Sequence, residues 1–282
     1  MVLSSGGTIS LITGIPRSGT TLCCHILNQQ QDYVALHEPF RPDNFEPNKE
    51  NILAQVKQRA TEVQNAIIAG LPFEHGHKRG LDIDNPIGME QKDGKRQSVA
   101  QRGEITLSLY KGREFCLVIK QNAFFTAYLQ ELTAHFDVLS IVRNPIDVLL
   151  SWWTVNLPVS RGQLPAGQQH NAALKLALSQ QSSTLERQIC IYQWFIHQFV
   201  QAKTRIVKYE DIVSSNGMAL CEHYGISSPV LSARSQPERQ YSPEILERLE
   251  HAQSKILAID CSGLYSHDYL SSKIRSYLSQ RA

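Results

Sequence analysis

Short apolar runs alternate with longer amphipathic stretches along most of the chain. Five runs rich in apolar and β-branched residues predict strands, at 8–13, 33–36, 115–119, 138–142 and 205–209. Stretches with helical character predict helices at 49–69, 122–135, 171–202, 216–224 and 243–258. Strands that alternate with helices predict an α/β fold, here a three-layer sandwich with a central parallel sheet.

Two segments interrupt this pattern. Segment 73–104 holds five glycines and many charges among few apolar residues, and segment 157–168 has two prolines and two glycines. We expect a single domain over 1–282, with both segments as loop excursions from the sheet. The runs 105–110 and 115–119 flank Lys111-Gly-Arg113, a pattern that predicts a β-hairpin.

The first predicted strand leads into a glycine-containing loop. Gly14 ends the strand, Pro16-Arg17-Ser18-Gly19-Thr20-Thr21 follows, and apolar residues then recur at helical spacing in 22–27. Two glycines allow a tight turn in which successive backbone N–H groups point inward, and the helix N-terminus adds positive potential. This strand, loop and helix therefore predict a P-loop-like phosphate-binding loop.

The loop differs from that of nucleoside triphosphatases, G-x-x-x-x-G-K-[ST], at the position that matters most. Thr20 stands where the lysine belongs, and the loop cation is Arg17 instead. The predicted strand 138–142 ends at Arg143 rather than at an aspartate able to help hold Mg²⁺. We expect an anion site that needs no metal, and a small-molecule kinase with a degenerate loop is the alternative.

Composition narrows the class of protein. The 282 residues are 42% hydrophobic and 19% charged, with a formal net charge of +2, which favours a globular chain and excludes nucleic acid or an anionic membrane as a bulk partner. The N-terminus has no charged stretch followed by an apolar one, and no run approaches the ~20 apolar residues that span a bilayer. We expect a soluble, cytoplasmic protein.

Cysteine and histidine give no metal-site pattern. None of the six cysteines forms a C-x-x-C pair, so we expect buried, reduced thiols. Among the ten histidines, His75-Gly-His77 comes nearest to a metal-binding spacing, but it lies in a polar segment. We predict no metal.

Two sequence strings together resemble the signatures of sulfotransferases that use 3′-phosphoadenosine 5′-phosphosulfate (PAPS). They are Pro16-Arg-Ser-Gly-Thr-Thr-Leu22 after a strand, and Ile141-Val-Arg-Asn-Pro-Ile-Asp-Val-Leu-Leu-Ser151. The resemblance implies that the first string binds the 5′-phosphosulfate, through Pro16, Arg17, Ser18, Gly19, Thr20 and Thr21. It also implies that Arg143 and Ser151, eight residues apart, bind the 3′-phosphate, although Arg143 as an ion-pair partner of Asp147 is the structural alternative.

The resemblance also implies catalytic roles at the ends of two other strands. His37-Glu38-Pro39 resembles the Glu-Pro segment of carbohydrate sulfotransferases, which implies that Glu38 is the general base, with His37 as its rival. Glu38 could instead pair with Arg41 or cap the next helix. Lys120 ends a buried strand, and we place it beside the transferring group with Arg17, an ordinary surface lysine being the alternative.

The late part of the chain lacks the Arg-Lys-Gly segment with which cytosolic family members complete the 3′-phosphate site. Arg234 and Arg239 are candidates to replace it. Tyr209-Glu-Asp resembles a family segment to which we assign a structural role. The sequence predicts no oligomeric state.

The resemblance implies transfer of a sulfuryl group to a hydroxyl group, or alternatively an amine, of a small-molecule acceptor, such as a natural product that the enzyme tailors. Segments 73–104 and 157–168 would lie on the acceptor side, the second as a flexible lid. Three acidic residues in the first would suit a cationic or hydroxyl-rich acceptor, a solvated loop face being the structural alternative: Asp82, Asp84 and Glu90. A cationic natural product and a sugar or lipid hydroxyl are both open as acceptors. A nucleotide-binding module without catalysis is the third hypothesis.

Overall fold

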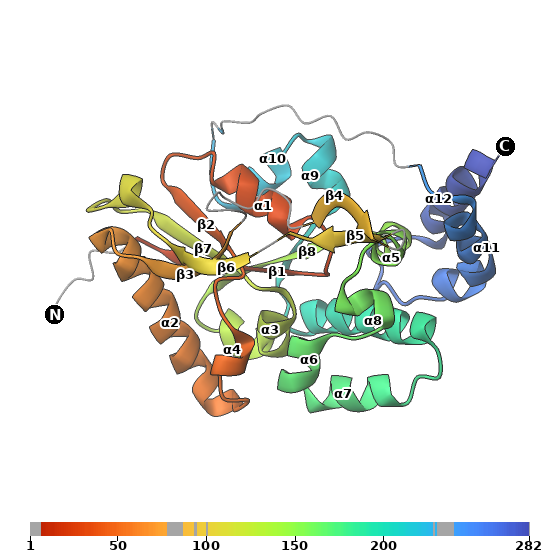
Figure 1. The fold of residues 1–282 in the computed structure, drawn as a ribbon, viewed down its shortest axis with the longest axis horizontal. Helices are drawn as coiled ribbons and strands as arrows, with labels where there is room; N and C mark the ends of the chain where they lie inside the picture. The colour runs from red at the N-terminus through yellow and green to blue at the C-terminus, as the bar shows by residue number, and fades with distance from the viewer. Residues whose placement is uncertain are drawn as a thin grey trace.

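The computed structural model describes residues 7–77, 87–92, 95–99, 101–227, 229 and 240–281. Five parallel strands form the central sheet (Figure 1), in the order β2-β7-β1-β8-β9. Their bounds are β1 Ile9–Gly14, β2 Tyr33–His37, β7 Cys116–Lys120, β8 Asp137–Val142 and β9 Arg205–Lys208. This sheet confirms the predicted α/β fold, and each strand overlaps one of the five predicted runs.

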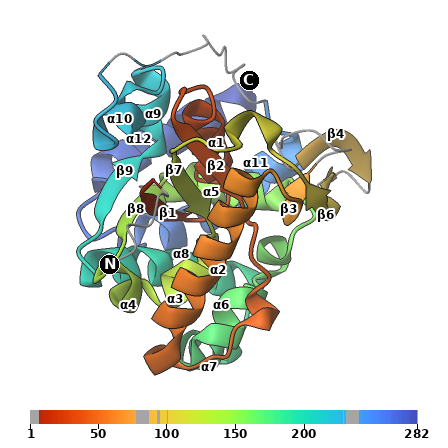
Figure 2. The same ribbon diagram turned by 90° about the vertical axis from the view of Figure 1, so that its left-hand side faces the viewer.

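Helices cover both faces of the sheet, as the two views show (Figures 1 and 2). One face carries α1 Thr20–Leu27, α9 Tyr209–Ser214 and α10 Met218–His223. The other carries α2 Lys49–Ala69, α3 Asn122–Ala127, α4 Leu129–Thr133, α6 Pro165–His170, α7 Ala172–Ser179 and α8 Thr184–Gln201. Helices α5 Pro145–Trp153, α11 Pro243–Leu257 and α12 His267–Leu278 pack together beyond the β8 side.

Side-chain alternation along the strands divides the interior into two hydrophobic clusters. Leu11 belongs to the cluster beneath α2, α3 and α8, whereas its neighbour Ile12 belongs to the cluster beneath α1 and α10. Ile119 and Val118 of β7 divide in the same way. Because successive side chains of a strand point to opposite faces, a strand buried on both faces is mostly apolar, and the few buried polar residues of β1, Ser10 and Thr13, form hydrogen bonds.

Local sequence signals fix the ends of several helices. The Asn48 side chain caps α2, which ends at Gly70 with φ +68°, and Ser183 with Glu186 forms a capping box at α8. Asn144 caps α5 by accepting a hydrogen bond from the Asp147 N–H, and Pro145 occupies the first helical position. The α5 helix therefore starts immediately after β8, two residues from Arg143.

The hairpin predicted over 105–119 is wrong. Strand β7 pairs in parallel with β1 and β2, because its apolar residues are buried between them in the central sheet. The preceding strand, β6 Gln101–Ile105, pairs with β3 Phe73–His77, and β4 Ile87–Lys92 pairs with β5 Lys95–Ser98, both antiparallel. Much of segment 73–104 is thus two small sheets of mainly polar strands.

Segment 157–168 also differs from the flexible loop we expected. It contains a 3₁₀ helix, Pro158–Arg161, and the start of α6, and it buries Val159 and Leu164. The predicted helix 122–135 divides into α3 and α4 at Tyr128, which has φ −125° and whose hydroxyl contacts His170 Nδ1 at 2.9 Å. Packing of aromatic groups against α6 thus interrupts a pattern that is helical in the sequence.

None of the helices in the described part of the chain is both long and apolar enough to span a membrane. Its six cysteines are free; four of them are buried, whereas Cys116 and Cys190 are half-buried. Three further 3₁₀ turns complete the described elements: Pro42–Asn44, Ser108–Tyr110 and Ser279–Arg281.

Candidate active site

The loop between β1 and α1 requires its glycines. A Cβ atom on Gly14 would lie 2.5 Å from Thr20 Cγ2 and 2.7 Å from the Ile141 carbonyl oxygen. Gly19 has φ +91°, and a Cβ atom there would lie 2.3 Å from the Tyr209 ring. Arg17 also adopts a positive φ, +75°, which is uncommon for a residue with a side chain and typical of functional loops.

Two loop residues are used to hold the loop in place. Ser18 is fully buried; its N–H donates to the Ile15 carbonyl and its Oγ to the Ile141 carbonyl, both at 2.9 Å. Trp152 Nε1 donates to the Pro16 carbonyl oxygen at 2.8 Å. The first turn of α1, at Thr20 and Thr21, has N–H groups without intrahelical partners and no acidic side chain, which suits an anion.

The two sequence strings meet at Arg17 and Ser151. Arg17 Nε donates to Ser151 Oγ at 3.1 Å, and Ser151 is completely buried on α5. The chain thus brings the loop cation and the serine of the second string together across 134 residues.

Arg143 lies two residues before the start of α5 and is nine-tenths buried. Its Nη2 and Nε donate to Asp147 Oδ2 at 3.0 and 3.3 Å, so the ion pair considered as an alternative is present. The guanidinium carbon lies 4.4 Å from the centroid of the Tyr209 ring, which in turn fills the space beside Gly19. Tyr209 therefore connects Arg143 to the loop between β1 and α1.

Several groups hold Asp147 in place besides Arg143. Tyr277 and Asn144 donate hydrogen bonds to its carboxylate at 2.5 and 3.0 Å, and Lys273 Nζ lies 3.5 Å from Oδ2. Burial opposes the charged form of this carboxylate, but Arg143 and Lys273 outweigh it and lower the pKa of Asp147. Glu210, the middle residue of the Tyr-Glu-Asp segment, accepts hydrogen bonds from the Asn144 backbone and side chain, in keeping with a structural role.

Glu38 and Lys120 form an ion pair at the carboxyl ends of β2 and β7. Lys120 Nζ lies 2.7 Å from Glu38 Oε1; the Lys120 side chain is 3% exposed and that of Glu38 42%. Lys120 is therefore not a surface lysine. Glu38 does not pair with Arg41, because Arg41 pairs with Glu74. Burial alone would raise the pKa of Glu38. The Lys120 charge and other nearby groups outweigh burial and lower this pKa to about 2.

His37, the rival base, lies opposite Lys120 in the β2–β7 register and is buried. Its Nδ1 lies 3.2 Å from Thr21 Oγ1 in the first turn of α1. Burial first and the Lys120 charge second lower the pKa of His37 to about 3. The imidazole is therefore neutral at pH 7.

The structure identifies one site residue that the sequence analysis missed. Arg102 of β6 donates from Nη2 to the carbonyl oxygens of Glu38 and Phe40 at 3.0 and 2.8 Å, and from Nη1 to that of Pro39 at 3.5 Å. These bonds hold a turn in which Glu38 has φ +51°, a conformation that is strained for a glutamate. Because Arg102 lies in a polar segment without a motif, no sequence signal singled it out.

The low pKa values predict how the rate depends on pH. A proton-accepting Glu38 or His37 loses its basic form only as the pH falls through about 2 or about 3, respectively. We therefore expect kcat/KM to stay level from pH 8 to pH 5 when initial rates are measured across a buffer series. An acidic limb near the ordinary histidine pKa of about 6.5 would contradict this assignment.

Four residues named in the sequence analysis lie outside the described part of the chain: Arg234, Arg239, Asp82 and Asp84. Within the described chain, no group of three or more histidine, cysteine, aspartate or glutamate side chains could hold a metal ion. The cluster therefore consists of the loop, Arg143, Ser151, Glu38, Lys120 and His37.

Comparison with known proteins places this geometry in a family. The family model described as a sulfotransferase domain matches residues 8–216. The chain belongs to the sulfotransferase family. A solved sulfotransferase from Alicyclobacillus acidocaldarius shares 12% sequence identity with it over 96% of each chain, with a TM-score of 0.45. No curated protein matches the chain.

The matched part of this sulfotransferase includes every described site residue named in the sequence analysis. The C-terminal helices α11 and α12 lie beyond it. Even so, α12 supplies Lys273 and Tyr277 to the Asp147 carboxylate, and Tyr265 just before it donates to Glu210 at 2.8 Å. The region outside the family match thus stabilises the network that contains Arg143.

Proposed function

We propose that this sulfotransferase transfers a sulfuryl group from PAPS to a hydroxyl group of a small-molecule acceptor. The observation that carries the proposal is the contact between Arg17 and Ser151, which joins the two predicted phosphate-binding strings in one cluster. The ionised Glu38 and Lys120 lie at the same edge of the sheet, at the carboxyl ends of β2 and β7.

The residues present suit a donor with a phosphate at each end. The first turn of α1 and Arg17 would hold the 5′-phosphosulfate, as a helix N-terminus holds anions elsewhere. Arg143 and Ser151 would hold the 3′-phosphate: Arg143 uses Nε and Nη2 for Asp147, and its Nη1 donates to none of the described residues. Lys273, which shares Asp147 with Arg143, adds positive charge there.

Lys120 and Glu38 divide the work at the reacting centre. As the acceptor oxygen bonds to sulfur, the bond between sulfur and the phosphate oxygen breaks, and negative charge grows on the leaving bisphosphate. Lys120 and Arg17 would stabilise that charge by donating hydrogen bonds. Glu38 takes the hydroxyl proton late in the reaction, when the forming S–O bond has made it acidic, so a carboxylate of low pKa suffices.

Ligand-dependent melting separates this proposal from its alternatives. We expect adenosine 3′,5′-bisphosphate at 100 times its Kd to stabilise the protein by about 2.7 kcal/mol. ATP with Mg²⁺ at the same concentration should stabilise it less. Sulfate transfer from PAPS, followed by mass spectrometry over an acceptor panel, should persist in EDTA. A larger effect of ATP with Mg²⁺ would favour the kinase, and bisphosphate binding without any transfer would favour a non-catalytic module.

A further inference from the structure

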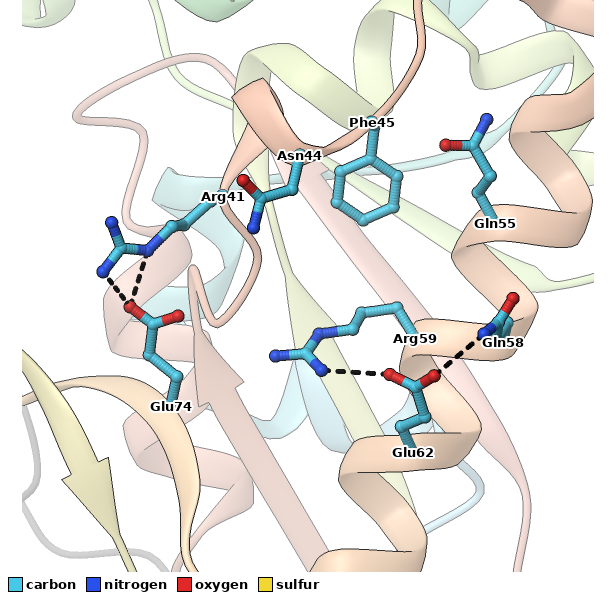
Figure 3. Close-up of a pocket in the computed structure, with 8 residues that line it drawn as sticks. All are labelled: Arg41, Asn44, Phe45, Gln55, Gln58, Arg59, Glu62 and Glu74. Atoms are coloured by element: carbon cyan, nitrogen blue, oxygen red, sulfur yellow. Dashed lines mark hydrogen bonds and ion pairs between the residues drawn. The ribbon is translucent and has the colours of Figure 1, made fainter.

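A polar cavity opens beside the segment that leaves the carboxyl end of β2 (Figure 3). Its volume is about 300 Å³, which falls at the lower end of the range for small-molecule sites. The segment supplies Arg41, Asn44 and Phe45, Glu74 of β3 lies beside Arg41, and the opposite wall comes from α2. The α2 residues in this wall are Gln55, Gln58, Arg59 and Glu62.

The charged side chains of the cavity balance one another. Arg41 pairs with Glu74 on one side, and Arg59 Nη1 lies 3.0 Å from Glu62 Oε2 on the other (Figure 3). Hydrogen bonds from the arginines lower the pKa values of both glutamates, so all four groups are ionised at pH 7. Two cations and two anions give the lining no net charge, and it therefore favours neither a cation nor an anion.

The lining nevertheless offers many hydrogen-bonding groups to a ligand. Gln55 Oε1 accepts from the Glu46 N–H at 3.1 Å, which fixes the orientation of the amide. Its Nε2 is buried and has no acceptor among the described residues, and such a donor is costly to leave unpaired. Phe45 also belongs to the wall, but it is only 6% exposed because its ring packs against Phe40 and Phe124.

The cavity lies close in the chain to the proposed base. Arg41 follows Glu38 by three residues, so their Cα atoms are at most ~11 Å apart. Arg102 fixes the carbonyl groups of the intervening turn, and its strand β6 pairs with β3, which carries Glu74. One rigid segment thus bears the candidate base at one end and the cavity wall at the other.

We propose that this cavity binds an uncharged, polyhydroxylated part of the acceptor, while one hydroxyl group of the same molecule reaches Glu38. Hydroxyl groups both donate and accept hydrogen bonds, so they can meet carboxylates, guanidinium groups and the exposed Gln58 amide together. This inference rests on the proposed function, and it selects the hydroxyl-rich one of the two acceptor classes, cationic and hydroxyl-rich, that the acidic residues of 73–104 would suit.

Binding is tested without donor, by saturation-transfer NMR on the whole protein with five probes. Maltotriose, chitobiose and myo-inositol are uncharged polyols, whereas spermidine is a cation and 4-nitrophenol an apolar hydroxyl compound. We expect at least one polyol to bind, and Glu62→Ala to weaken it by roughly 10-fold or more, because a hydrogen bond to a charged group is lost. Gln58→Ala should weaken it by roughly 2- to 13-fold, as expected for a neutral bond.

Matched substitutions on the same helix serve as controls. Lys57→Ala and Asn65→Ala change exposed residues of α2 that do not line the cavity, and they should leave polyol binding unchanged. The Arg59–Glu62 pair is exposed, so its loss should not unfold the protein, which the melting temperature will verify. The inference would be overturned if none of the three polyols bound. It would also be overturned if Glu62→Ala and Gln58→Ala both left polyol binding unchanged.

The outcome is separable from that of the proposed function. If PAPS-dependent transfer occurs to an acceptor whose KM is unchanged by Glu62→Ala and Gln58→Ala, the cavity inference fails and the function stands. If a polyol binds at these residues but no acceptor receives sulfate from PAPS, the polyol site stands and the proposed function fails.

Discussion

Glu38→Gln is expected to lower the turnover number by about 100-fold or more, while the affinity for adenosine 3′,5′-bisphosphate stays nearly unchanged. The amide cannot take the hydroxyl proton, but it still offers an oxygen to Lys120, which is 3% exposed. Glu38→Ala would leave that ammonium group buried without its partner and would add a stability cost to the catalytic one. Glutamine is therefore the cleaner substitution, and single-turnover rates with isothermal titration of the bisphosphate measure both quantities.

Two further variants complete this test. Glu222→Ala removes an exposed carboxylate from α10, far in sequence from the site, and should have no effect on turnover. His37→Gln removes the rival base. Full activity of Glu38→Gln together with an inactive His37→Gln would move the base to the imidazole that contacts Thr21.

The Glu38–Lys120 pair shows how far the sequence could lead. Each residue follows a run of apolar residues, so the sequence placed both at the carboxyl ends of strands and hence at the edge where α/β proteins bind ligands. It did not show that β2 and β7 are neighbours, because strand order depends on long-range packing. The structure supplies that adjacency, and with it the 2.7 Å ion pair.

The second sequence string, which is predicted to bind the 3′-phosphate, shows a different limit. Helix rise alone puts Arg143 and Ser151 ~12 Å apart along α5, so the sequence required Arg143 to fold across to the serine. In the structure Arg17, from the other string, contacts Ser151, while Arg143 turns to Asp147 and Tyr209. Tertiary contacts between strings cannot be inferred from the spacing within one string.

Polar and irregular segments were the least predictable parts of the chain. Strands β3 and β6 pair through backbone hydrogen bonds in a stretch with little apolar alternation, and so the hydrophobic pattern indicated only a loop. Arg102 could not be found for the same reason, since its importance comes from three carbonyl groups 62 to 64 residues away. The prolines and glycines of segment 157–168 predicted a flexible loop. Both of its prolines, however, occupy the first turns of short helices.

Arg143→Ala is expected to weaken binding of adenosine 3′,5′-bisphosphate by roughly 10- to 150-fold, since a hydrogen bond to a charged group contributes ~1.5–3 kcal/mol. The protein should still fold, because Asp147 retains Asn144, Tyr277 and Lys273 as partners. Isothermal titration gives the affinity, and adenosine 5′-monophosphate as a second ligand shows whether the loss belongs to the 3′-phosphate. That loss should be absent for the monophosphate.

Arg248→Ala provides the matched control for this substitution. Arg248 of α11 stacks over Trp153 of α5 with its guanidinium carbon 4.3 Å from the ring centroid, so its removal costs similar packing against the same helix. Trp153 and Ser151 are two positions apart on α5 and face different directions, which places Arg248 away from the proposed phosphate. Two results would mean that the 3′-phosphate binds elsewhere. One is that Arg248→Ala weakens binding of the bisphosphate as much as Arg143→Ala does, and the other is that Arg143→Ala leaves this binding unchanged.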